Sequence, residues 1–409
     1  MRLLNTFTYR LEDFAGSPGH NEYYAVLSHT WADEEILFED VQDPESLKRC
    51  GKRGLPKLLN SCKAACEYGL RYIWIDTCCI DKSSSAELSE AINSMFAYYE
   101  NSTICFVYLA DFDSTYGIES TAFAQSRWFT RGWTLQELLA PKKVEFLDAQ
   151  WVSIGHRRQL AGRLAEITRI DVRALQRHLR PDCEDTRFGV CDGCGADSNI
   201  RSLLKPYSVA TRMSWAANRH TTRPEDIAYS LLGLFDIHMP LLYGEGPKAF
   251  LRLQKEIIQN SNDQSILAWD LTGVGRHLKA PSELAPSPSY FTDGYQAIPS
   301  LMEKFKMAIS PGGLKLDVFL GPCRLIRSAD TPPASGRLAL LNCRRTDDCF
   351  CCPGLLLDEV AAGTNAFRGI SSFGGRVYHI TPERSEVSIR LGTDMVTGEA
   401  PREMAGAWF

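Results

Sequence analysis

Short apolar runs of β-forming residues alternate with amphipathic segments over the first 150 residues, and this alternation limits the fold more than any other feature. Strands are predicted over residues 23–28, 71–75, 104–109 and 144–147. Apolar residues at three- and four-residue spacings predict helices over 55–68, from Ser84 onward and over 133–139. Strands joined by helices form a parallel sheet covered on both faces. We therefore expect an α/β fold with a doubly wound, mostly parallel sheet, whose ligands bind beyond the carboxyl ends of the strands.

The chain changes character twice after this region. Residues 157–180 and 209–258 are predicted to be helical, and a polar insert that contains cysteine separates them at 181–199. After about residue 270, Pro and Gly punctuate short alternating runs, which are typical of a small β-sandwich or open barrel. We predict three domains: an α/β domain over 1–165, a helical module over 166–270 and a β-rich domain over 271–409.

The composition excludes several classes of partner and location. The net charge is −5 and there is no basic run, so neither nucleic acid nor an anionic membrane surface is expected as a partner. The most apolar late stretch, 227–243, is shorter than the ~20 residues of a membrane span and contains Asp236 and Pro240. The N-terminus lacks the apolar run of a signal peptide, and several cysteines lie in apolar periodic segments. We expect a cytoplasmic protein with reduced thiols.

Four ordered blocks make the α/β region recognisable. They are Tyr24–Trp31 (YAVLSHTW), Trp74–Lys82 (WIDTCCIDK), Ala91–Phe96 (AINSMF) and Arg127–Leu138 (RWFTRGWTLQEL). Together they closely resemble the heterokaryon-incompatibility (HET) domain of filamentous fungi, over residues 20 to 150. Later blocks look like the uncharacterised helical module that follows HET domains, at 221–233, 240–246 and 252–258. The tail shows no nucleotide-binding loop or repeat array, so the chain resembles the short members of this family.

The resemblance implies a role in fungal non-self recognition, in which the HET domain triggers programmed cell death when unlike cells fuse. It implies self-association or docking to another incompatibility protein, with no required cofactor. It also implies kinship with TIR domains, α/β signalling modules whose Trp-Cys-x-x-Glu-Leu pattern is similar to Trp133–Leu138. In catalytic TIR domains this glutamate cleaves the nicotinamide–ribose bond of NAD. The resemblance therefore makes Glu137 the candidate catalytic residue of an NAD nucleosidase, with NAD as substrate and activation by self-association.

Glu137 has two interpretations from sequence. Nicotinamide leaves through an oxocarbenium-like transition state, whose positive charge a carboxylate beside the ribose would stabilise. Alternatively, Glu137 is structural and pairs with Arg127 or Arg131, or caps its own helix. The same block serves a signalling scaffold that has no catalysis, so the sequence leaves enzymatic activity open.

Other candidate ligand-binding residues lie at strand ends or in the tryptophan-rich blocks. Asp76 and Asp81 would border the crevice and contact a nucleotide, although closing a turn is the favoured interpretation of these aspartates. Ser28 and His29 are neighbours on a strand and point to opposite faces, which argues against a Ser-His nucleophile pair. The tryptophans are expected in the core and the crevice wall. The full candidate set is Ser28, His29, Trp31, Asp76, Asp81, Arg131 and Trp133.

The polar insert offers possible metal ligands in Cys183, Cys191 and Cys194, with His178 upstream. A metal would order a segment that is poor in apolar residues. A structural zinc site usually shows two Cys-x-x-Cys pairs, however, and the family does not require one. We therefore treat zinc as the less favoured alternative.

Overall fold

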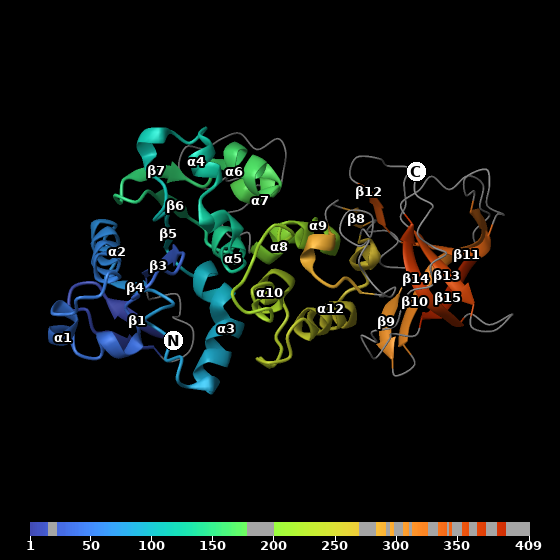
Figure 1. Ribbon diagram of the computed structural model, residues 1–409, viewed down its shortest axis with the longest axis horizontal. Helices are drawn as coiled ribbons and strands as arrows, with labels where there is room; N and C mark the ends of the chain where they lie inside the picture. Colours follow the sequence, from blue (N-terminus) through green and yellow to red (C-terminus); the bar gives the residue numbers. More distant parts are fainter. Residues whose placement is uncertain are drawn as a thin grey trace. The chain divides into compact units, whose positions relative to one another are not determined.

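The computed structural model describes residues 1–14, 23–177, 200–269 and 284–291. It also describes shorter stretches of the C-terminal part, at 295–297, 306–310, 313–325, 334–341, 343–345, 354–359, 366–373 and 383–389. Contacts divide the chain into two compact units (Figure 1). The first contains Met1–Pro206 and Asn218–Gly244, and the second contains Tyr207–Ala217 and Glu245–Phe409. The three-domain division drawn from the sequence remains a prediction.

The first unit is built on a seven-stranded sheet, which confirms the predicted α/β class. Its four central strands are parallel, and the remaining strands pair antiparallel at the two edges. All six residues of the central β3 are buried, as expected for a strand that is covered on both faces. The spatial order is β2 (Leu11–Asp13), β1 (Arg2–Asn5), β4 (Tyr72–Trp74), β3 (Tyr24–His29), β5 (Ile104–Tyr108), β6 (Val144–Leu147), β7 (Ser153–His156).

The helices that connect these strands begin and end where local chemistry allows. Helix α2 (Leu55–Glu67) is followed by Gly69 at φ 81°, a left-handed conformation that suits glycine. Helix α3 (Ser85–Glu100) starts after Ser84, whose hydroxyl accepts a hydrogen bond from the Glu87 amide. Helix α5 (Thr134–Leu139) leads into β6. The remaining short helices are η1 (Phe38–Val41), α1 (Pro44–Lys48), η2 (Ser114–Tyr116), α4 (Thr121–Ala124), η3 (Arg127–Thr130), α6 (Ala161–Thr168), α7 (Val172–Gln176), α8 (Ile200–Leu204), α10 (Asp226–Tyr229) and α11 (Leu232–Phe235).

The order of the central strands fixes where a crevice forms. The chain leaves β3 through α2 to reach β4 on one side, and it leaves β4 through α3 to reach β5 on the other side of β3. Right-handed crossovers in opposite directions place α2 and α3 on opposite faces of the sheet. The connections after β3 and β5 therefore diverge, and in α/β sheets the ligand site lies at this switch point.

Helix α11 packs on α3 through a glycine. A Cβ atom added to Gly233 would lie 2.1 Å from Cβ of Phe96, at the root of a side chain that cannot rotate away. The close approach of α11 to α3 therefore requires glycine at position 233. Gly233 and Phe96 are 137 residues apart in the chain.

We expect Gly233→Ala to lower the free energy of unfolding by about 1–3 kcal/mol, because the added methyl group forces α11 away from Phe96. Gly162, inside α6, has nothing within 4 Å of its added Cβ. Gly162→Ala should raise the stability by about 0.5–1 kcal/mol, because it removes chain entropy from the unfolded state without a clash. Urea unfolding of both variants compares them; equal effects would contradict the packing argument.

The second unit contains helices and a set of strands. Helix α12 (Lys248–Asn260) buries Phe250, Leu253 and Ile257 along one face. Asp263, at the start of η4 (Gln264–Leu267), accepts a 2.7 Å hydrogen bond from the first amide of α9 (Val209–Ser214). Six strands form one sheet in the order β11 (Ala334–Leu340), β13 (Gly354–Glu359), β14 (Ala366–Phe373), β15 (Glu383–Ile389), β10 (Gly313–Leu325), β9 (Met307–Ser310), while β8 (Tyr295–Ala297) pairs with β12 (Cys343–Arg345).

Helix length and polarity bear on membrane insertion. Over the part of the chain that the structure describes, every helix is too short or too polar to cross a bilayer.

Candidate functional site

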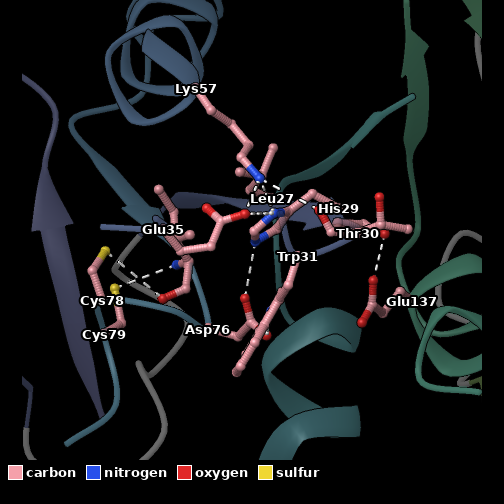
Figure 2. A network of polar contacts seen from close by, with 12 residues as sticks. Leu27, His29, Thr30, Trp31, Glu35, Lys57, Asp76, Cys78, Cys79 and Glu137 are labelled. Atoms are coloured by element: carbon pink, nitrogen blue, oxygen red, sulfur yellow. Dashed lines mark hydrogen bonds and ion pairs between the residues drawn. The ribbon is translucent and has the colours of Figure 1, made fainter. Parts of the chain in front are cut away.

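Three buried side chains meet at the carboxyl end of β3. The indole Nε1 of Trp128 donates a 2.8 Å hydrogen bond to Oγ of Ser28, and that hydroxyl donates a 2.5 Å hydrogen bond to Oε2 of Glu137. Glu137 is 6% exposed, while Ser28 and Trp128 are almost completely buried. We call these three residues the Glu137 cluster; Figure 2 shows the Glu137 carboxyl group with this hydrogen bond.

Local packing places the members of the Glu137 cluster. Ser28 belongs to β3 and faces α5, which carries Glu137 in its first turn. The ring of Trp128, in η3, packs edge-on against Phe146 of β6. The hydroxyl of Thr134, the first residue of α5, donates to the Trp128 carbonyl at 2.7 Å and ties the helix to η3.

The environment of Glu137 favours the protonated acid. Burial raises its pKa to about 8, and the charge of Asp76 adds to this rise. The hydrogen bond from Ser28 and the charges of Arg219 and Arg131 oppose it only in part. Arg127, one of the two arginines considered as a partner of Glu137, forms an ion pair with Asp111 instead. A neutral carboxylic acid at neutral pH is a common state for catalytic acids in buried sites.

This raised pKa predicts that the folded protein loses stability as the pH rises. The unfolded glutamate titrates near 4.5 and the folded one near 8, so the folded state binds the extra proton between these values. Stability should therefore fall from about pH 5 to about pH 8, with a limiting slope of about 1.4 kcal/mol per pH unit from this group. Chemical denaturation at several pH values measures it. In Glu137→Gln this part of the slope should vanish; a slope unchanged by the substitution would contradict the prediction.

A second set of buried charged groups lies on the α2 side of β3 (Figure 2). Nζ of Lys57 forms an ion pair with Glu35 and lies 2.9 Å from Nδ1 of His29. An ammonium group only donates hydrogen bonds, so Nδ1 accepts and the imidazole carries its proton on Nε2. The Nε2 atom lies 3.1 Å from Oδ1 of Asp76, and Nε1 of Trp31 donates to Oδ2 at 2.9 Å. We call these five residues the His29 cluster.

The His29 cluster holds Asp76 in the ionised form. Burial opposes ionisation, but hydrogen bonds from His29 and Trp31 and the charge of Lys82 outweigh it and lower the pKa of Asp76. The ammonium of Lys82 lies 3.8 Å from the centre of the Trp31 ring, a cation–π contact. The Asp76 side chain is 22% exposed and that of His29 only 2%, so Asp76 is the more accessible of the two.

The side chains of the other predicted residues have partners outside these clusters, although the charge of Arg131 reaches Glu137. Asp81 accepts hydrogen bonds from the amide and hydroxyl of Ser83 and closes a turn. Arg131 donates to the Thr222 hydroxyl, and Trp133 contacts the Asp226 carboxyl group. Cys183, Cys191 and Cys194 lie outside the described residues. Across the ranges that are described, no group of three His, Cys, Asp or Glu is arranged to hold a metal ion.

Sequence reasoning missed several members of this site. Lys57 and Glu35 were not candidates, because a lysine on a helix and a glutamate in a loop are ordinarily solvated. Arg219, whose charge reaches Glu137, was also missed, although it stands just before the block at 221–233. Trp128 is one of the tryptophans expected in the core and the crevice wall, but its hydrogen bond to Ser28 has no sequence signal.

Comparison with known proteins finds similarity over two parts of the chain. Residues 24–123 match the family described as "Heterokaryon incompatibility protein (HET)". The "Vegetative incompatibility protein HET-E-1" of Podospora anserina is 42% identical over 271 residues, which cover 64% of this chain and 18% of that protein. The matched region is thus less than a fifth of the length of this relative. No solved structure matches the chain.

Proposed function

We propose that this chain, whose residues 24–123 match the HET family, acts in fungal non-self recognition and triggers programmed cell death. The observation that carries the proposal is the 42% identity to a vegetative incompatibility protein over 271 residues, a length well beyond the HET match itself. In this proposal the protein is a cytoplasmic signalling module that self-associates or docks on another incompatibility protein.

The strand order of the first unit supports this proposal, and we infer from it a TIR-like architecture. The four central strands follow the order β4-β3-β5-β6, which is a doubly wound arrangement with its switch point beside β3. Ser28 lies near the end of β3, which is the first of these strands along the chain. The Trp133–Leu138 motif lies next to it, at α5. Serine and glutamate, far apart in the chain, meet where such folds bind ligands.

Induced expression of the full chain in a fungal host tests the signalling proposal. Viable counts should fall at least about tenfold after induction, as expected of a death signal, while an empty vector has no effect. The variant Gly132→Val serves as the disrupted comparison. A Cβ atom at Gly132 would lie 2.5 Å from Cγ2 of Thr221 and would disturb the segment that carries Glu137. Full viability in cells that accumulate the folded wild-type chain would contradict the proposal.

A second candidate function is hydrolysis of NAD, and the Glu137 cluster favours it specifically. The bond between ribose C1′ and the nicotinamide nitrogen breaks, water adds to C1′ and loses a proton, and the products are nicotinamide and ADP-ribose. Ionised Glu137 would stabilise the positive charge that develops on the ribose. Because Glu137 is 6% exposed, substrate access requires a rearrangement, which we assign to self-association. NAD is a substrate here and no cofactor is required.

Nicotinamide release from NAD by the purified full chain tests this second function. Release should increase with protein concentration more steeply than linearly, because association of copies completes the site. Absence of release from both dilute and concentrated protein would leave the signalling function without NAD chemistry.

A further inference from the structure

The segment after Asn218 pairs with the loop that precedes α5. The amide of His220 donates to the Thr130 carbonyl at 2.7 Å, and the amide of Gly132 donates to the His220 carbonyl at 2.9 Å. These two hydrogen bonds make an isolated parallel bridge between Arg131 and His220. The chain therefore pairs at His220 with the block that holds Trp128 and Glu137, and both segments belong to the same compact unit.

Arg219 reaches from this segment into the buried start of α5. Its Nη1 donates to the Arg131 carbonyl at 2.9 Å and to Oγ1 of Thr134 at 2.8 Å. The residue is 7% exposed. Burial lowers the pKa of Arg219 to about 10, and the charge of Glu137 opposes this fall. The guanidinium remains a cation at neutral pH and holds its charge beside Glu137.

We infer that Arg219 is a positioning residue of the Glu137 site, which fixes the first turn of α5 and directs positive charge toward the Glu137 carboxyl group. Arg219, like Trp128 and Glu137, follows the residues that match the HET family, and it brings a segment more than 80 residues further along the chain to the site. The inference deepens the proposed NAD chemistry and rests on it for its purpose, but the arrangement is testable without substrate.

The hydrogen bonds of Arg219 explain why arginine is needed. A guanidinium donates in one plane to several acceptors, whereas a lysine ammonium at the same place would satisfy them poorly. The Thr134 hydroxyl that accepts from Arg219 also donates to the Trp128 carbonyl. Arg219 is thus connected through Thr134 to Trp128, whose indole orients Ser28.

Titration of Glu137 in the full chain tests the inference. Carboxyl ¹³C NMR with labelled glutamate follows the group, and Glu137→Gln assigns its signal. The other groups that bear on this titration are Ser28, Arg131 and Asp76, together with Tyr99 and Cys105, whose own ionisation Glu137 disfavours. Arg219→Gln should raise the midpoint by about one pH unit or more, because it removes a nearby positive charge.

Arg157 provides the matched control. It is also buried, at 3% exposure, and donates to the Leu138 carbonyl at the other end of α5, but its charged neighbour is Arg177. Arg157→Gln should destabilise the protein and leave the Glu137 midpoint unchanged. Equal midpoints in wild type, Arg219→Gln and Arg157→Gln would overturn the inference.

Thr134 supplies a second, milder test if Arg219→Gln does not fold. Thr134→Val removes an acceptor of Arg219 with little change in shape, and Thr134→Ser keeps the hydroxyl. The Glu137 midpoint should rise in the valine variant only, and a midpoint that is the same in both would overturn the inference. These titrations contain no NAD, so a protein that fails to cleave NAD can still show the expected shifts, and the two failures are distinguishable.

Discussion

Replacing Lys57 with methionine is expected to lower the free energy of unfolding by about 3–5 kcal/mol, because it leaves the buried Glu35 carboxylate without its cation. The side chains of Lys57 and Glu35 are 10% and 6% exposed, so water cannot replace the lost partner. Methionine fills a similar volume, so lost packing contributes little. His29 also loses the donor to Nδ1 that fixes its tautomer and its alignment on Asp76.

A second substitution separates the charge effect from packing. Glu35→Gln in the Lys57→Met background removes the unpaired buried charge. In the wild-type chain the Ala32 amide donates a 2.7 Å hydrogen bond to Oε1 of Glu35, and the amide oxygen of glutamine can accept the same bond. Most of the lost stability should return in this double variant. The exposed pair Lys63–Glu67 is the matched control, and Lys63→Met should change stability by less than about 0.5 kcal/mol. Equal losses in Lys57→Met and Lys63→Met, by urea unfolding, would contradict the argument.

Local patterns predicted the central strands and the main helices of the first unit. Each of these elements has a signal that lies within a short stretch of sequence. The signals are the apolar run before His29, the apolar stripe of α2 followed by Gly69, and the helix cap at Ser84. The edge strands β1, β2 and β7 were not predicted, because they lack the run of β-branched and aromatic residues that marks the equally short β4. Their pairing is a tertiary property of the sheet.

The site was only partly predictable for a similar reason. Ser28 and Glu137 are 109 residues apart; the rule that ligands bind at strand ends made Ser28 a candidate, and the family resemblance made Glu137 one. That rule names positions and not partners. The ion pair of Lys57 with Glu35 and the reach of Arg219 depend on packed helices and loops, for which the sequence has no local pattern.

Glu137→Gln is expected to lower nicotinamide release from NAD at least about a hundredfold, because an amide cannot supply the negative charge that stabilises the ribose cation. Since the pKa of Glu137 is about 8 and the ionised form is required, wild-type activity should rise with pH and reach half of its maximum near pH 8. Ser28→Ala should shift this rise to higher pH, because the Ser28 hydrogen bond lowers the pKa of Glu137.

The same variants decide between chemistry and assembly as the cause of cell death. Glu145→Gln is a matched control, because Glu145 lies on β6 outside the cluster and accepts a hydrogen bond from Ser153. If NAD cleavage kills, Glu137→Gln should restore both viability and NAD levels in induced cells, while Glu145→Gln should kill as the wild type does. Killing by folded Glu137→Gln at wild-type strength would separate death from Glu137 chemistry. Glu137 would then have only a structural role, and cell death would follow from assembly of the protein alone.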